Sequence, residues 1–197
     1  MNPVEQIVAD RNAARQSSDP NADVCFLATT DANGRAHVRT LVLREIVDNR
    51  FGVYLNRSSP KWRQLAENNG YELLLFYPTI SRQYRLSGTT QEIDPAIVSS
   101  NWHMRPAASK YLDYFYREVQ PQSSSIESRQ ALLSEVDSLK SRHPDPDGLS
   151  ASDLAAGLDL VITSIDRLDI SSDPDRIHDR FNYSLRQGDW VEQVLVP

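Results

Sequence analysis

Arg176-Ile-His-Asp-Arg-Phe-Asn-Tyr183 is the most informative stretch of the chain, because basic side chains alternate along a segment that otherwise reads as a strand. Successive side chains of a strand point to opposite faces, so Arg176, His178 and Arg180 are expected on one face. A guanidinium group matches the oxygens of a phosphate, and such a face suits an anion. An exposed edge strand with its charges in water is the alternative at this point.

A second strand-like segment also carries basic residues and favours the anion interpretation. It reads His37-Val-Arg-Thr-Leu-Val-Leu-Arg44, with an apolar run between its two arginines. Arg39 and Arg44 are separated by an odd number of positions, so they face opposite sides of a regular strand. This placement suits two different ligands, or one ligand and a partner subunit.

Further motifs follow in a fixed order along the chain. They are Phe51-Gly-Val-Tyr-Leu-Asn56, Arg57-Ser-Ser-Pro60 with Lys61-Trp-Arg63, Ser81-Arg-Gln-Tyr-Arg-Leu-Ser-Gly88, Arg105-Pro-Ala-Ala-Ser109 and Gln122-Ser-Ser-Ser125. In residue type, order and spacing the chain resembles the pyridoxamine 5'-phosphate oxidases, which are FMN enzymes, from about Cys25 to Pro197. The resemblance implies an α+β fold: an FMN-binding split β-barrel, mostly antiparallel, with inserted and flanking helices.

The resemblance also implies an FMN site built from several separate segments. One of them has independent support, because Lys61 lies just inside an expected helix whose start follows two serines. Free N–H groups, hydroxyls and a lysine suit a phosphate. The residues implied for FMN are Arg39, Thr40, Leu41, Val42, Leu43, Tyr54, Leu55, Ser59, Lys61, Gln83, Gln122, Ser123 and Arg180.

A second phosphate site, for a vitamin B6 substrate, follows from the same resemblance. Arg105 and Ser109 are four residues apart, so on a helical turn they share a face. The resemblance places Arg176 and His178 over the substrate ring and its amine, as the catalytic residues. The residues implied for the substrate are Arg44, Asn101, Arg105, Ser109, Arg176 and His178.

Four positions depart from the family pattern. Arg44 stands where the family has lysine, Pro60 replaces an arginine, and Asn101 replaces a tyrosine. Ile170 lies where a tryptophan is expected. Pro60 removes one cation from the expected FMN phosphate site, which Arg57 or Arg63 could replace, whereas the change at Ile170 bears on the substrate more than on the fold or on FMN.

The activity implied by the resemblance is the oxidation of pyridoxamine or pyridoxine 5'-phosphate to pyridoxal 5'-phosphate, with oxygen as the acceptor. A homodimer with the flavin at its interface is implied as well. Two alternatives stay open: a related FMN oxidoreductase acting on another small molecule, and a flavin- or haem-binding module with little turnover. The presence of Arg105, Ser109, Arg176 and His178 argues against the module, because a protein that binds only FMN needs no second phosphate site.

Composition limits the other classes of function. The chain has 197 residues, one cysteine and a net charge of −6. This charge gives no reason to expect nucleic acid or an anionic membrane. Because Cys25 is the only cysteine, an intrachain disulfide is excluded. No apolar run is long enough to span a bilayer. With acidic Glu5 and Asp10 near the start, no secretory signal is expected, so we expect a cytoplasmic protein.

Hydrophobic periodicity predicts the order of helices and strands. Residues 1–22 are expected to form a helix and a linker, and residues 23–197 a single barrel domain. Asn33-Gly34 between two apolar runs predicts a hairpin. Strands are expected at 24–30, 36–46, 51–56, 72–77, 83–93, 158–170, 177–185 and 190–196. Helices are expected at 2–16, 60–68 and 109–117, after Asp94-Pro95, and after Ser124-Ser125.

Overall fold

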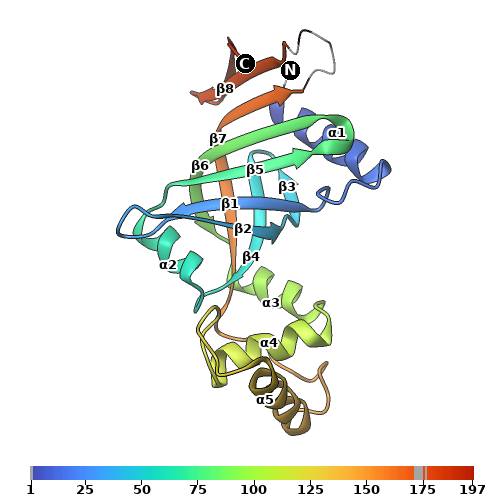
Figure 1. The fold of residues 1–197 in the computed structure, drawn as a ribbon, viewed down its shortest axis with the longest axis vertical. Helices are drawn as coiled ribbons and strands as arrows, with labels where there is room; N and C mark the ends of the chain where they lie inside the picture. The colour runs from blue at the N-terminus through green and yellow to red at the C-terminus, as the bar shows by residue number, and fades with distance from the viewer. Residues whose placement is uncertain (1, 171–174, 176) are drawn as a thin grey trace.

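The computed structural model describes residues 2–170, 175 and 177–197, which form a curled antiparallel sheet with helices at its ends (Figure 1). The strands are β1 (Val24–Thr30), β2 (Ala36–Val42), β3 (Glu45–Val47), β4 (Arg50–Asn56), β5 (Tyr71–Tyr77), β6 (Arg82–Glu92), β7 (Ala155–Asp169), β8 (Asp179–Arg186) and β9 (Asp189–Leu195). The helices are α1 (Pro3–Gln16), α2 (Pro60–Glu67), α3 (Pro95–His103), α4 (Ala107–Glu118) and α5 (Arg129–Arg142), with a 3₁₀ turn at Pro78–Ile80. None of the described helices is long and apolar enough to cross a membrane.

The sheet is organised around β7, its longest strand. The strand order is β2-β1-β5-β6-β7-β4-β3, and β8 pairs with β7 while β9 pairs with β8. β6 runs beside almost the whole of β7, whereas β4 pairs with its first half and β8 with its second half. As a result, β4 lies within the central barrel, whereas β8 lies at the end of the molecule opposite to α4 and α5 (Figure 1).

Alternating burial explains why these segments are strands. β1 and β5 bury every second side chain, as in a sheet with one face on the core. Leu27, Leu73, Leu75 and Tyr84 are completely buried in this core. A second apolar cluster, centred on Trp102, holds α4 and α5 together below the sheet.

The N-terminal helix α1 is joined to the barrel by buried polar contacts as well as by apolar packing. Ile7 is completely buried in the main core. The buried Arg11 guanidinium donates hydrogen bonds to the carbonyl oxygens of Ala22 (3.0 Å) and Leu43 (2.6 Å). The second bond ties α1 to the residue that follows β2.

The structure corrects two details of the sequence-based prediction and confirms a third. The expected strand 36–46 is broken at Leu43 and Arg44. The Leu43 amide donates to the Asp23 carbonyl oxygen and the Arg44 amide to the Gly52 carbonyl oxygen. As a result, β2 pairs with β1 and β3 pairs with β4. The helix expected directly after Ser124-Ser125 begins at Arg129, and Ser128 caps it by accepting from the Ala131 amide. The hairpin at Asn33-Gly34 is confirmed, with Gly34 in the left-handed region.

A β-bulge at Ser87/Gly88 shifts the register between β6 and β7. Bulges bend a strand and increase its twist, which helps this long pair to curl. A Cβ atom at Gly88 would lie 1.9 Å from the Val161 carbonyl oxygen. Since that neighbour is sheet backbone, it has little freedom to move away.

We therefore expect Gly88→Ala to lower the free energy of unfolding by roughly 2–4 kcal/mol, as overpacking against backbone does. Urea denaturation followed by circular dichroism measures the change. Gly70→Ala is the matched control, because the atom nearest to its new Cβ belongs to the movable Asn68 side chain. Equal stabilities of the two variants would contradict the role given to the bulge.

Candidate functional site

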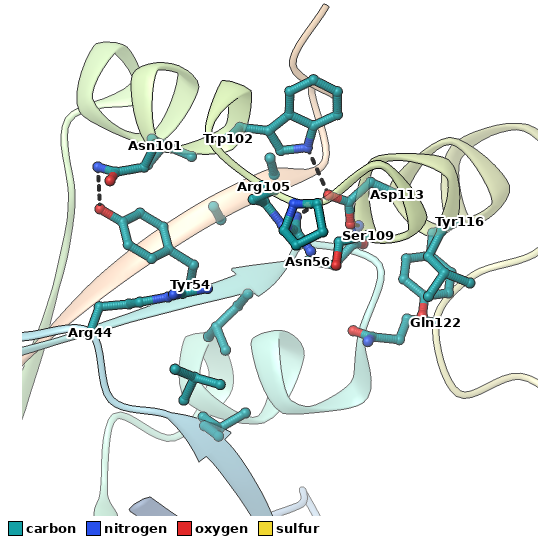
Figure 2. Close-up of a pocket in the computed structure, with 18 of the residues that line it drawn as sticks. Arg44, Tyr54, Asn56, Asn101, Trp102, Arg105, Ser109, Asp113, Tyr116 and Gln122 are labelled. Carbon is teal, nitrogen blue, oxygen red and sulfur yellow. Dashed lines mark hydrogen bonds and ion pairs between the residues drawn. The ribbon is translucent and has the colours of Figure 1, made fainter. Parts of the chain in front are cut away.

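A cavity of about 420 Å³ lies where β4 and the end of β2 meet α2, α3 and α4 (Figure 2). It gathers predicted residues from segments that are far apart in the sequence. Six of those predicted to bind FMN line it: Leu41, Val42, Tyr54, Leu55, Lys61 and Gln122. Four of those predicted to bind the substrate line it as well: Arg44, Asn101, Arg105 and Ser109.

The N-terminus of α2 provides one cationic part of the cavity. The Lys61 ammonium group donates to the Gln122 side-chain oxygen at 3.1 Å. Burial, and next the charge of Arg39, lower the pKa of Lys61 to about 8. The Ser59 hydroxyl is buried behind the cavity lining, has no hydrogen-bond partner among the described residues, and does not cap the helix. A lowered lysine pKa and an orphan hydroxyl both fit a site that is completed by an anion.

Arg39 does not line the cavity, but it lies close enough to Lys61 for its charge to act on this part. Its guanidinium donates to the Thr29 hydroxyl at 2.5 Å and to the Gln64 side-chain oxygen at 2.9 Å. Burial lowers the pKa of Arg39. Its partners are neutral oxygens, so its charge still acts on Lys61. The two cations therefore repel each other until an anion binds.

The second cationic part lies between α3 and α4 and includes a residue that the sequence analysis missed. Arg105 forms a short ion pair with Asp113, which is buried. The same carboxylate accepts a hydrogen bond from the Trp102 indole at 2.7 Å (Figure 2). Its other oxygen lies 3.5 Å from the Asn56 amide nitrogen. The spacing of Arg105, Ser109 and Asp113 at intervals of four was a signal that was available in the sequence.

Tyr54 and Asn101 form a polar wall on another side of the cavity. The Asn101 amide nitrogen donates to the Tyr54 hydroxyl at 2.7 Å (Figure 2). Burial is the main cause that raises the pKa of Tyr54, so this hydroxyl keeps its proton at neutral pH. Arg44 enters the same space because the chain turns between β2 and β3.

Several predicted site residues lie away from this cavity. Thr40 is exposed on β2, Leu43 is buried in the core, and Ser123 is exposed beside Gln122. Gln83 and Arg180 both pair with Leu168 on β7, and Arg180 forms a two-pronged ion pair with Asp166 at 2.7 and 3.1 Å. His178 directly precedes β8. Arg176 lies outside the described residues.

The distance along β7 separates Gln83 and Arg180 from the cavity. Tyr54 of the cavity wall pairs with Gly157, whereas Arg180 pairs with Leu168. At the rise of an extended strand, these two positions on β7 are roughly 35 Å apart. A single chain therefore does not bring the two groups of predicted residues together.

Comparison with known proteins agrees with the fold and with the motifs. Residues 15–143 match the family model described as pyridoxamine 5'-phosphate oxidase. The chain belongs to this family. It is 32% identical over 196 residues to a pyridoxine/pyridoxamine 5'-phosphate oxidase of Acinetobacter baumannii (strain SDF), which covers 100% of the chain and 88% of the relative. A protein of the same name from Rhodopirellula baltica is 31% identical and covers 91% of the chain and 78% of the relative.

Two solved structures share the fold over the whole chain. PhzG from Burkholderia lata, solved with tetrahydrophenazine-1-carboxylic acid, has a TM-score of 0.86 and 21% identity, covering 100% of this chain and 93% of PhzG. An FMN-binding protein related to pyridoxamine 5'-phosphate oxidase, from Nostoc punctiforme, has a TM-score of 0.77 and 21% identity, covering 100% and 99%. These likenesses confirm the FMN-binding split-barrel fold.

The lowered pKa of Lys61 predicts pH-dependent anion binding. A dianion such as sulfate binds the protonated ammonium group, so its affinity for the ligand-free protein should fall about tenfold for each pH unit above 8. The rise in melting temperature caused by sulfate, measured from pH 6.5 to 9.5, reports this loss. Lys61→Met should remove the pH-dependent part, while Arg63→Met, an exposed position on α2, should keep it. A sulfate effect that persists unchanged to pH 9.5 would contradict the assignment.

Proposed function

We propose that this protein is an FMN-dependent oxidase that converts pyridoxamine or pyridoxine 5'-phosphate to pyridoxal 5'-phosphate. The observation that carries the proposal is the presence of two cationic parts in one cavity. Lys61, backed by Arg39, forms one part, and Arg44 with Arg105 forms the other. A flavin phosphate and a substrate phosphate together need two such anion sites.

FMN fits the first part. Lys61 and Gln122 would hold its phosphate, and the walls formed by β2 and β4 would take its ring. When bound, FMN supplies the chemistry, because it accepts a hydride from the substrate carbon, and oxygen restores it. The protein's contribution is to bind, orient and shield the reactants.

The second part would bind and orient the substrate. The Arg105 guanidinium is held by Asp113, and the Ser109 hydroxyl lies on the following turn, so both are placed to donate to one anionic group. Arg44 adds a positive charge from the opposite wall. Met104 and Leu112 add exposed apolar side chains to the lining of the cavity.

A homodimer would complete this site. Gln83, His178 and Arg180 lie at the end of the molecule where β8 is found, away from the cavity of the same chain (Figure 1). They would therefore serve the cavity of a second copy. Exposed valines on two of the edge strands, β2 and β9, give such a partner an apolar surface to cover. They are Val38 and Val42 on β2 and Val191 and Val194 on β9.

A second candidate is an FMN oxidoreductase of the same family that acts on a different small molecule. The observation that favours it is the Arg105–Asp113 ion pair, because a neutralised guanidinium attracts a phosphate dianion less strongly. Asn101, where the family has a tyrosine, also changes the wall that faces the substrate.

The oxidase proposal predicts that the substrate reduces the flavin. Under anaerobic conditions, pyridoxamine 5'-phosphate or pyridoxine 5'-phosphate should bleach the visible absorbance of the FMN-loaded protein, and air should restore it. Pyridoxine without its phosphate is the control, and it should react far more slowly because it lacks the anion held by Arg105. If the phosphorylated compounds neither bleach the flavin nor shift its spectrum, the second candidate replaces the first.

The dimer proposal predicts the size of the FMN-loaded protein. Sedimentation velocity should give a dimer of the 22.3 kDa chain, with flavin absorbance moving in the same boundary. Val194→Asp should weaken the dimer, because it places a charge in the surface that the partner would cover. A wild-type monomer that retains FMN would contradict the shared site.

A further inference from the structure

One buried carboxylate, that of Asp10, joins the N-terminal helix α1 to the start of β6. Its oxygens accept hydrogen bonds from the Gln6 side-chain amide at 2.8 Å, from the Arg82 Nε at 3.2 Å and from the Tyr84 hydroxyl. Burial, and next the bond to Asp10, raise the pKa of Tyr84, so its hydroxyl keeps its proton and donates the hydrogen bond. The carboxylate is therefore a fixed link between the helix and the strand.

Arg82 and Tyr84 are the two neighbours of Gln83 on β6. Side chains alternate along a strand, so Asp10 holds the backbone from one face while Gln83 projects from the other. Gln83 is only the second residue of the strand, which starts directly after the left-handed Ser81. Because the ends of elements open most readily, the position of Gln83 depends on the contacts made by its two neighbours.

The same contacts extend to the strand that carries Arg180. Gln83 and Arg180 lie in one row across β6, β7 and β8, because both pair with the same residue of β7. In the adjacent row, the Arg82 guanidinium forms an ion pair with Asp169 of β7 at 2.7 Å. Through Arg82, Asp10 therefore fixes the row next to the one that contains both residues expected to bind FMN.

We propose that Asp10 is a positioning residue for FMN, and that it acts on the cavity of a second copy rather than on the cavity of its own chain. The inference rests on the shared site of the proposed function, in which Gln83 and Arg180 of one chain meet Lys61 of another. None of the described residues of α1 lines the cavity. The helix begins beside β8 instead, at the end of the molecule that would serve the partner (Figure 1).

A rival route stays within one chain. Arg11 follows Asp10 on α1, and its guanidinium holds the Leu43 carbonyl oxygen, next to Arg44 in the cavity of the same chain. A displaced helix would then disturb that cavity, and a poorly folded variant would lose FMN as well. The two routes differ in which cavity of a dimer is damaged.

The first test is the FMN affinity of Asp10→Asn, which keeps the shape of the side chain but removes the charge that holds Arg82. Measured from the flavin fluorescence released when the loaded dimer is diluted, the affinity should fall about tenfold. Glu5→Gln is the matched control, because it removes a carboxylate from an exposed position of the same helix and should leave the affinity unchanged. Unchanged affinity in Asp10→Asn would overturn the proposal.

A mixed dimer of Asp10→Asn and Lys61→Met chains shows which cavity depends on Asp10. It is obtained by co-expressing the two chains with different affinity tags. One of its cavities combines Lys61 of one chain with Asp10 of the other and is unaltered, while the second cavity carries both defects. The mixed dimer should therefore bind FMN with wild-type affinity at half of its sites, although both homodimers bind it weakly.

Action of Asp10 within its own chain, or on folding alone, gives the opposite result. The cavity that keeps Lys61 then lies in the damaged chain, so the mixed dimer has no site of wild-type affinity, and this outcome overturns the proposal. If Asp10→Asn does not form a dimer, Arg82→Gln breaks the same contact from the strand. Arg82 is partly exposed and Asp169 keeps its ion pair with Arg167, so this variant should fold, and the same mixing experiment decides.

Failure of this proposal is distinguishable from failure of the proposed function. Flavin reduction by the phosphorylated B6 compounds tests the oxidase, and it does not depend on which copy supplies Asp10. A wild-type monomer that retains FMN overturns both the shared site and the role of Asp10. A dimer that holds FMN tightly in Asp10→Asn, or that shows no recovery on mixing, overturns the role of Asp10 alone.

Discussion

The pairing of β7 with three other strands is the constraint on which the rest of the structure depends. One half of the strand is occupied by β4 and the other half by β8, while β6 follows nearly all of it. Because the strand is long, these partners cannot be neighbours of each other. The cavity forms at the β4 end, and the basic residues of β8 are carried to the far end (Figure 1). A site that uses both groups therefore needs two copies of the chain.

A break between β2 and β3, at the edge of the sheet, brings Arg44 into the cavity. Where β2 stops, the Leu43 carbonyl is bound by the buried Arg11 guanidinium, and the Arg44 amide turns to Gly52. Each of these bonds satisfies a backbone group that the broken strand would otherwise leave unpaired. The N-terminal helix thus helps to set the position of Arg44, although no residue of α1 lines the cavity.

The sequence predicted most of the elements, because alternating and helical periodicities are local signals. It did not predict the break at Leu43, since the partners of that turn, Asp23 and Gly52, are distant in the sequence. Lys61, Arg105 and Gln122, which the motifs singled out for two different ligands, line one cavity. The motifs could not show that Gln83 and Arg180 lie far from it in the same chain, because a motif records chemistry and order but not which copy supplies a residue.

The two cationic parts of the cavity differ in how their charge is compensated, and this difference matches two kinds of ligand. Among the described residues, the hydrogen-bond partners of Arg39 and Lys61 are all neutral, so a bound anion would relieve the repulsion between these two cations. Such a site suits a cofactor that stays bound. Arg105 already has Asp113, so an anion arriving there gains less and leaves more easily. Weak, exchangeable binding is what turnover requires of a substrate site, because product must depart in each cycle. Under the proposed function, the acid beside Arg105 would thus give one cavity both a tight anion site for the cofactor and a loose one for the substrate.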